Sequence, residues 1–307
     1  MKNYAAIDVG SNSFHLKIVA VENGNLHETV LDKRIVHRLA AKDSSGKTYI
    51  PEEKIIGGLK IIKEFAADIA GHRAGYLGFA TSAVRESING ADFLARVKKE
   101  TGITVSIISG HKEAELIYEG AMLFLPDDER EITVIDIGGG STEIIKGRGT
   151  RYLYAESIPV GAVRCSQMFA PEFTYSDQAI NSIREYALAQ LLQNFPEKSA
   201  FISPLVIGTS GTFNSLSMLK PFLSPDESLI SYDLILKIEL LCSEYKEIKS
   251  RLTLSYIEKN KLEILPASIT ILKAIADYFG FAEFIYSPYA IREGMIRELI
   301  RKEESHG

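Results

Sequence analysis

Short apolar runs that end at glycine or small polar residues alternate with longer amphipathic stretches through the first part of the chain. The apolar or β-rich runs at 4–7, 14–21, 26–34, 75–80 and 103–108 predict strands. Between the third and fourth runs, one face at helical spacing carries Ile55, Ile56, Leu59, Ile62, Phe65 and Ile69. We therefore expect a helix with Pro51 at its first position, and further helices over 93–101 and 112–124.

The same order of elements begins again after Pro126-Asp127-Asp128, which we interpret as a linker. The second part predicts strands at 132–137, 142–146, 151–157, 205–208 and 284–286, and helices at 161–169, 176–194, within 231–279 and at 291–302. This repeat predicts a duplicated α/β fold with an active-site cleft between two halves, as in actin, hexokinase and heat-shock ATPases (ribonuclease H-like). The expected domains are 1–125, completed by the C-terminal helix 289–307, and 126–288.

Two similar glycine-rich turns follow the first strand of each half, and an aspartate precedes each turn. The first has Gly10, Ser11, Asn12 and Ser13 after Asp8, and the second has Gly138, Gly139, Gly140, Ser141 and Thr142 after Asp136. Amide and hydroxyl groups in such turns can bind phosphate, and the aspartates can bind a hard cation. One such turn alone is as well explained as an ordinary hairpin, but two copies favour phosphate binding. A third turn of small residues contains Gly208, Gly211 and Thr212.

Four charged residues close to predicted strand ends are further candidates for chemistry. Arg85 and Arg164 lie at early helical positions and can make bidentate contacts with phosphate. The alternative for Arg85 is a solvated helix start, and Arg164 could equally be a surface arginine. Glu113 lies in the first turn of a predicted helix, where a carboxylate can also be a simple capping residue. Glu143 follows the second glycine turn on a predicted strand, which favours a role beside a metal, a water or a base.

Composition and charge narrow the class of protein. The chain is 46% hydrophobic and 24% charged, as is usual for a globular protein, and no apolar stretch reaches the ~18–20 residues of a membrane span. A net charge of −5 does not favour nucleic acid, and a polyanionic substrate would need a local basic path, for which Lys33, Arg34, Arg38 and Lys42 are candidates. Two cysteines without metal spacing, and no signal peptide, lead us to expect a cytoplasmic protein that acts on neither nucleic acid nor membrane.

Taken together, these segments resemble the exopolyphosphatase / guanosine pentaphosphate phosphatase (Ppx/GppA) family. The matching runs, in the family's order, are AIDVGSNSFHL (6–16), ATSAVRES (80–87), ISGHKEAELIYEG (108–120), VIDIGGGSTEII (134–145), SIPVGAVR (157–164), GTSGT (208–212) and YAIREGM (289–295). The resemblance implies a two-domain actin-like fold and Mg²⁺-dependent hydrolysis of a terminal phosphate. The implied substrates are inorganic polyphosphate and guanosine penta- or tetraphosphate, and a homodimer is compatible with this assignment.

The resemblance also implies roles for individual residues. Glu113 matches the proposed water-activating base, and Glu143 matches the glutamate that positions the water or metal. Asp136 matches the metal-associated aspartate, and the two glycine turns match the phosphate loops. Arg85 and Arg164 match basic positions near the cleft. The third turn departs from the family's Gly-Gly-Thr, which bears on substrate choice. The chain ends near residue 307, so we expect a short form that acts non-processively on short chains.

Two other functions stay open from the sequence. An ATP-dependent small-molecule kinase of the same fold would use the same phosphate loops, but it needs an aspartate base that no motif here supplies. A catalytically silent nucleotide or alarmone sensor is the second alternative, against which Glu113 and Glu143 argue. Within the hydrolase interpretation, the sequence does not separate polyphosphate from guanosine pentaphosphate.

Overall fold

The computed structural model describes residues 1–43, 45–247 and 258–305. Contacts between residues divide the chain into two compact units, of which the first comprises Met1–Gly120 and Ile291–Gly307, and the second Ala121–Ala290. The first unit is therefore built from both ends of the chain, and the second is continuous. The sequence-based boundaries were 125/126 and 288/289.

The first unit contains a five-stranded sheet in the order β3-β2-β1-β6-β7. Strand β1 pairs antiparallel with β2 and parallel with β6, β2 pairs antiparallel with β3, and β6 pairs parallel with β7. The strands are β1 (Lys2–Val9), β2 (Ser13–Glu22), β3 (Asn25–Val36), β6 (Gly75–Ala80) and β7 (Ser106–Ile107), and a separate small ladder joins β4 (Ala41–Lys42) to β5 (Thr48–Tyr49). The helices are α1 (Glu52–Gly71), α2 (Ser82–Arg85), α3 (Gly90–Thr101), α4 (Gly110–Ala121) and α11 (Ile291–Glu304).

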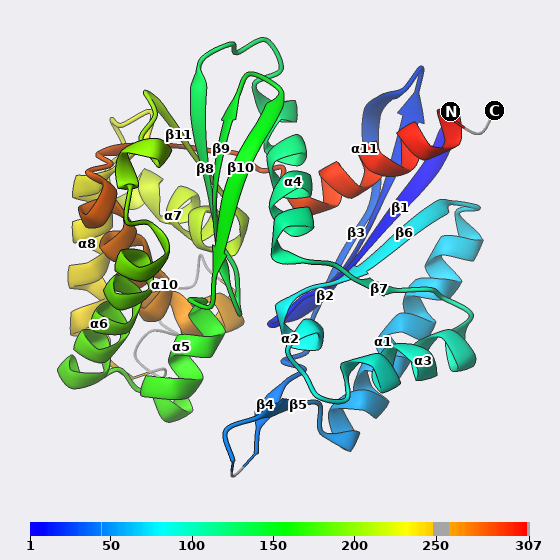
Figure 1. Cartoon of the computed structure of the whole chain (residues 1–307), viewed down its shortest axis with the longest axis horizontal. Helices are drawn as coiled ribbons and strands as arrows, with labels where there is room; N and C mark the ends of the chain where they lie inside the picture. Colours follow the sequence, from blue (N-terminus) through cyan, green and yellow to red (C-terminus); the bar gives the residue numbers. More distant parts are fainter. Residues whose placement is uncertain (44, 248–257, 306–307) are drawn as a thin grey trace. The chain divides into compact units, whose positions relative to one another are not determined.

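Helices cover both faces of this sheet. Helices α1 and α3 pack together over the face that carries Phe14, and Phe14, Phe65 and Phe93 are fully buried between them. Because successive strand residues point to opposite faces, His15 lies on the other face, where α11 packs along β1 and β6 (Figure 1). The face beside α11 therefore carries Asp8 of β1, His15 of β2 and Arg34 of β3, which lie opposite one another in register.

The second unit repeats this arrangement with a six-stranded sheet in the order β10-β9-β8-β11-β13-β12. Its strands are β8 (Glu131–Ile137), β9 (Thr142–Arg148), β10 (Arg151–Ile158), β11 (Leu205–Thr209), β12 (Ile230–Ser231) and β13 (Glu283–Tyr286). Its α-helices are α5 (Ala162–Phe169), α6 (Asp177–Asn194), α7 (Ser210–Leu223), α8 (Tyr232–Glu244) and α10 (Lys259–Phe279), with 3₁₀ turns at Met122–Phe124, Pro171–Phe173 and Lys198–Phe201. A core of buried apolar side chains, including Ile183, Leu191 and Leu272, joins α6, α10 and the sheet.

The order of strands confirms the duplication expected from the sequence. In both sheets an antiparallel three-stranded meander is continued by parallel strands, so that β8, β9, β10 and β11 correspond to β1, β2, β3 and β6. Two local predictions are also confirmed. Asn23 and Gly24 both have positive φ, as the tight turn between β2 and β3 requires, and the helix α3 is capped at its C-terminus by the left-handed Gly102.

The structure corrects three sequence expectations. Pro51 is the N-cap of α1 and lies outside the helix, with an extended ψ of 148°. The strand expected over 103–108 is reduced to Ser106–Ile107, because only those two residues pair with β6. The strand that contains Gly208 is present as predicted, but no separate turn follows it: β11 ends at Thr209, and Gly211 and Thr212 belong to the first turn of α7. Part of the helical stretch expected within 231–279 lies outside the described residues, at 248–257.

Candidate active site

Each glycine-rich turn joins the first two strands of its sheet through the same backbone contact. In the first unit the amide of Gly10 donates to the carbonyl of Ser13 at 3.1 Å, and in the second the amide of Gly138 donates to the carbonyl of Ser141 at 3.0 Å. The two turns predicted from the sequence are thus equivalent in structure as well as in composition.

In the first unit, the ends of three parallel strands bring the other candidates close to the first turn. The amide of Thr81 donates to the carbonyl of Val9 at 3.2 Å, and the amide of Ile108 donates to the carbonyl of Ala80 at 3.2 Å. The hydroxyls of Ser11 and Ser82 are hydrogen-bonded at 2.8 Å. The first glycine turn and the beginnings of α2 and α4 therefore share the carboxyl edge of the sheet, where ligands bind in open α/β sheets.

Glu113 lies in the first turn of α4, and its carboxylate is held by Arg85. Ser109 caps this helix, because its hydroxyl accepts from the amide of Lys112 at 3.2 Å. The Glu113 carboxylate accepts from Arg85 Nη1 at 3.0 Å, and its side chain is 10% exposed. An ion pair with a guanidinium is made by the ionised carboxylate, which is the form that can take a proton from water.

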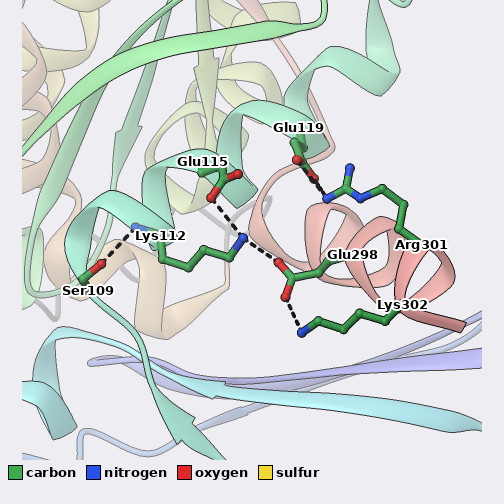
Figure 2. A network of polar contacts seen from close by, with 7 residues as sticks. All are labelled: Ser109, Lys112, Glu115, Glu119, Glu298, Arg301 and Lys302. Carbon is green, nitrogen blue, oxygen red and sulfur yellow. Dashed lines mark hydrogen bonds and ion pairs between the residues drawn. The ribbon is translucent and has the colours of Figure 1, made fainter. Parts of the chain in front are cut away.

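Helix α4 is in turn fixed to α11 by charged and steric contacts. Lys112 Nζ lies 2.6 Å from Glu298, which also accepts from Lys302 at 2.6 Å, and Arg301 pairs with Glu119 at 2.8 Å (Figure 2). A side chain at Gly294 would place its Cβ 2.0 Å from the carbonyl of Leu116, so only glycine permits this approach of the two helices.

Two residues of the predicted basic path contact the first turn directly. Arg34 Nε donates to Ser13 Oγ at 3.2 Å, and Arg38 Nε donates to Asn12 Oδ1 at 3.2 Å. Lys33 instead pairs with Asp68 at 2.6 Å, which offsets its charge locally. Arg34 and Arg38 are therefore the members of this cluster that the structure brings to the turn.

The second glycine turn directs its carbonyl groups toward α5. The amide of Ala162 donates to the carbonyl of Gly138 at 3.0 Å, and the amides of Val163 and Arg164 donate to the carbonyl of Gly139 at 2.9 Å. Arg164 Nε donates to the carbonyl of Gly140 at 2.6 Å, so this arginine, a predicted phosphate contact, also orders the turn.

This orientation determines where the amides of the turn point. In a trans peptide the N–H group points opposite to the carbonyl, so the amides of Gly139, Gly140 and Ser141 all point away from α5. Three successive N–H groups on one side of a turn form an anion-binding concavity. Gly161 allows α5 to come this close, because a Cβ there would lie 2.5 Å from the carbonyl of Gly139.

The third segment of small residues, 208–212, is hydrogen-bonded to the strand residue that precedes the second turn. Ser210 and Thr212 hydroxyls donate to the carbonyl of Ile137 at 3.1 and 3.2 Å, so the hydroxyl hydrogen of Thr212 is already used within the protein. A Cβ at Gly208 would lie 2.1 Å from the ring of Phe213, which gives this glycine a packing role. At Gly211, which is exposed, a Cβ would meet no atom within 4 Å, so this glycine has no comparable packing role.

Asp136 and Glu143 face one another across β8 and β9, and both are buried, at 6% and 1% exposure. Thr209 Oγ1 donates to Asp136 at 2.6 Å, and Ser157 Oγ donates to Glu143 at 2.7 Å. Facing side chains on antiparallel strands have Cβ atoms about 4.5–5.5 Å apart, where like charges destabilise each other. A cation bound by both carboxylates would remove this repulsion.

These two carboxylates fit Mg²⁺ in the form in which proteins usually hold it. Magnesium is bound through one or two carboxylates together with water and substrate phosphates, and rarely by an all-protein cage. Among residues 1–43, 45–247 and 258–305, no group of three or more His, Cys, Asp or Glu side chains could hold a metal.

Asp8 occupies the place in the first unit that Asp136 occupies in the second, but the residue facing Asp8 is His15. His15 was not predicted as a site residue from the sequence. Its position two residues after Ser13, on the same face of the strand, is what could have indicated that it lies close to the turn.

Comparison with known proteins agrees with this arrangement. The model of the Ppx/GppA phosphatase family matches residues 17–303. A Haemophilus influenzae protein provisionally named an exopolyphosphatase is 29% identical over 97% of this chain and 92% of its own length. A Photobacterium profundum protein named guanosine-5'-triphosphate,3'-diphosphate pyrophosphatase is 27% identical over 99% of this chain, which spans 60% of that relative.

Solved structures show the same fold. The Aquifex aeolicus member of the Ppx/GppA family superposes with a TM-score of 0.80 at 24% identity, over 98% of both chains. An exopolyphosphatase structure from Cytophaga hutchinsonii has a TM-score of 0.88 at 23% identity, over 98% of both chains. The predicted duplicated actin-like fold is thereby confirmed. Within the described residues, no helix is long and apolar enough to cross a membrane. The chain belongs to the Ppx/GppA phosphatase family.

Proposed function

We propose that this chain is a Mg²⁺-dependent exopolyphosphatase that releases the terminal phosphate of inorganic polyphosphate. The observation that carries the proposal is the buried Glu113 carboxylate, ion-paired with Arg85 at the sheet edge that also holds the first glycine turn. A hydrolase needs a base beside its phosphate-binding groups, whereas a silent sensor does not.

In the proposed reaction, Glu113 orients a water molecule in line with the terminal phosphorus and accepts its proton. The water oxygen forms a bond to phosphorus while the bridging P–O bond breaks, and the shortened chain leaves with the bridging oxygen. Positioning and charge neutralisation supply most of the rate in such transfers. In the first unit, the hydroxyls of the first turn and Arg38 would bind phosphate oxygens. In the second unit, the amides of Gly139, Gly140 and Ser141 would bind phosphate oxygens, and Asp136 and Glu143 would hold Mg²⁺, which supplies positive charge when bound.

A second substrate has one specific observation in its favour. The Photobacterium profundum relative bears the name of an enzyme acting on guanosine pentaphosphate, and it matches almost the whole of this chain. We rank it second because the polar groups described above all suit phosphate, and none of them selects a guanine base. Since each turn offers donors for only a few phosphate groups, we also propose that short polyphosphates are good substrates.

The test is a side-by-side assay of phosphate release from tripolyphosphate, longer polyphosphate and guanosine pentaphosphate, with Mg²⁺ and no acceptor molecule. We expect release from polyphosphate, and its loss in Glu113→Gln. Faster release from guanosine pentaphosphate would assign the second substrate. ATP consumption only in the presence of a hydroxyl acceptor would identify a kinase, and tight binding without release would identify a sensor.

A further inference from the structure

A chain of polar contacts connects helix α11 to the first glycine turn through His15. Arg292 Nη1 lies 3.1 Å from His15 Nδ1, and His15 Nε2 lies 2.8 Å from Ser13 Oγ. Ser13 is 6% exposed, and its hydroxyl also receives Arg34 Nε at 3.2 Å. His15 of β2 and Arg34 of β3 thus contact one serine of the turn, and Arg292 of α11 is connected to it through His15.

The contact with Arg292 determines which ring nitrogen of His15 carries the hydrogen. A guanidinium has five N–H donors and no acceptor, so Nδ1 must offer its lone pair to Arg292. A neutral imidazole has one N–H group, which is then on Nε2. His15 therefore donates from Nε2 to Ser13.

The two donors in turn determine the direction of the Ser13 hydroxyl. A serine hydroxyl has two acceptor sites and one hydrogen. Nε2–H of His15 and Nε–H of Arg34 occupy both acceptor sites, so the hydrogen of Ser13 must point to a further partner. Ser13 is thereby prepared as a donor, and the oxygens of an ionised phosphate are acceptors.

We propose that His15 is a positioning residue that makes Ser13 an obligate hydrogen-bond donor to the substrate phosphate, with Arg292 fixing the tautomer of the ring. This inference rests on the proposed function for the identity of the phosphate. It also gives a reason for the difference between the halves: the residue facing the aspartate is His15 in the first unit and Glu143 in the second. One half would orient a donor where the other carries a carboxylate.

The first experiment reads the tautomer without any substrate. Nitrogen-15 NMR of labelled protein distinguishes a protonated from an unprotonated ring nitrogen, and comparison with His15→Gln assigns the signal. We expect protonated Nε2 and unprotonated Nδ1 at neutral pH, and loss of this tautomer preference in Arg292→Met. A ring protonated at Nδ1 would overturn the proposal. This measurement stands whether or not the protein hydrolyses polyphosphate.

The second experiment tests whether His15 acts through Ser13. We expect His15→Phe and Ser13→Ala each to raise the KM for tripolyphosphate about 10-fold, the scale of one hydrogen bond to a charged group, with a smaller change in kcat. The double variant should be no worse than Ser13→Ala alone, and His15→Gln, which keeps a donor at the Nε2 position, should recover part of the loss. Multiplying effects in the double variant would show that His15 acts independently and would refute the proposal.

Two further measurements distinguish a positioning role of His15 from a general effect on folding and from a failure of the proposed function. His27, exposed on β3 of the same sheet, is the matched site, and His27→Phe should leave KM unchanged. Calorimetry with inorganic phosphate as the probe gives a second readout that needs no turnover. If the protein binds phosphate through the His15–Ser13 pair but releases none from polyphosphate, the proposed function fails and the positioning role stands. Equal phosphate binding by wild type and His15→Phe would overturn the positioning role.

Discussion

Arg85 Nη1 donates both to the carboxylate of Glu113 and to the carbonyl of Ile108, each at 3.0 Å. The arginine thus ties the carboxylate to the backbone just before α4. The hydrogen bond from this nitrogen therefore holds Oε2 of Glu113 at a defined place relative to the backbone at Ile108. A base that orients one water molecule needs this restriction, since its geometry is fixed before substrate binds.

Replacing Glu113 with Gln should lower turnover by ~10²-fold or more, the scale of losing a general base. Glutamine keeps the size of the side chain but cannot accept a proton from water. Steady-state phosphate release measures the effect, and thermal denaturation checks that the fold is retained. Glu115→Gln, two residues along the same helix, is the matched control and should keep near-normal turnover. Near-normal turnover in Glu113→Gln would remove this residue from the mechanism.

Replacing Glu143 with Gln should also lower turnover by ~10²-fold or more while leaving the cation-free protein at least as stable as wild type. The reason is that the substitution removes one of two buried carboxylates that face each other. Turnover and thermal denaturation in chelator are the two measurements. Glu131→Gln, exposed on β8, is the control. A large loss of stability in chelator would show that Glu143 is structural and not repelled by Asp136.

Removal of divalent cations should abolish phosphate release, and added Mg²⁺ should restore it. In the proposed site, the facing carboxylates of Asp136 and Glu143 would provide two oxygen ligands, and the substrate phosphates would provide others. The measurement is turnover after exhaustive chelation, followed by titration with Mg²⁺. Full turnover in the chelated protein would contradict both the metal requirement and the assignment of this carboxylate pair.

Arg38→Gln should raise KM for polyphosphate more at low salt than at high salt. The partly exposed guanidinium contacts Asn12 of the first turn, and charges near the surface are screened over ~10 Å at 0.1 M salt. KM measured across ionic strengths gives the dependence. Lys63→Gln, exposed on α1, serves as control, because the same charge is removed away from the turn. An unchanged KM for Arg38→Gln at low salt would exclude Arg38 from substrate binding.

Burial raises the pKa of the Cys165 thiol to about 12 from an ordinary value of 9.0. Between these values the unfolded chain loses the thiol proton and the folded chain keeps it, so stability falls as pH rises above 9. At pH 10.5 the loss from this group should be about 2 kcal/mol. Denaturant unfolding at pH 7.5 and 10.5 measures it, and Cys165→Ala should show a smaller pH dependence. Equal pH dependence in both proteins would contradict the shift.

The parts of this molecule that could be predicted from sequence are those set by local pattern. The apolar runs before Gly10 and Gly138 predicted two strands with equivalent turns, and both turns have the same Gly-to-Ser backbone contact. Glycine spacing and strand alternation act over a few residues, so one chain carries the signal. Predicted strands such as 14–21 were therefore correct within one or two residues of β2.

The pairings inside the site could not be predicted, because they depend on register and on contacts between distant residues. That Glu143 faces Asp136 follows from the pairing of β8 with β9, and no pattern in either strand fixes that register. Arg85 and Glu113 belong to different helices, and His15 meets Arg292 only after α11 packs on the sheet. A third turn was predicted at 208–212 because small residues favour turns, but Gly208 instead lets the ring of Phe213 pack against β11.

The placement of α11 in the first unit also sets an order of events during synthesis. Residues 1–120 leave the ribosome before the second unit does. At that stage they lack α11, which carries Gly294 and Glu298 and packs on α4. The second unit is continuous and can complete its core first, although domains generally fold from the N-terminus onward. The helix that bears Glu113 therefore acquires its support only after α11 has been made. A nascent chain released before α11 is made would contain Glu113 without the ion pairs that join α4 to α11, Lys112 with Glu298 and Arg301 with Glu119.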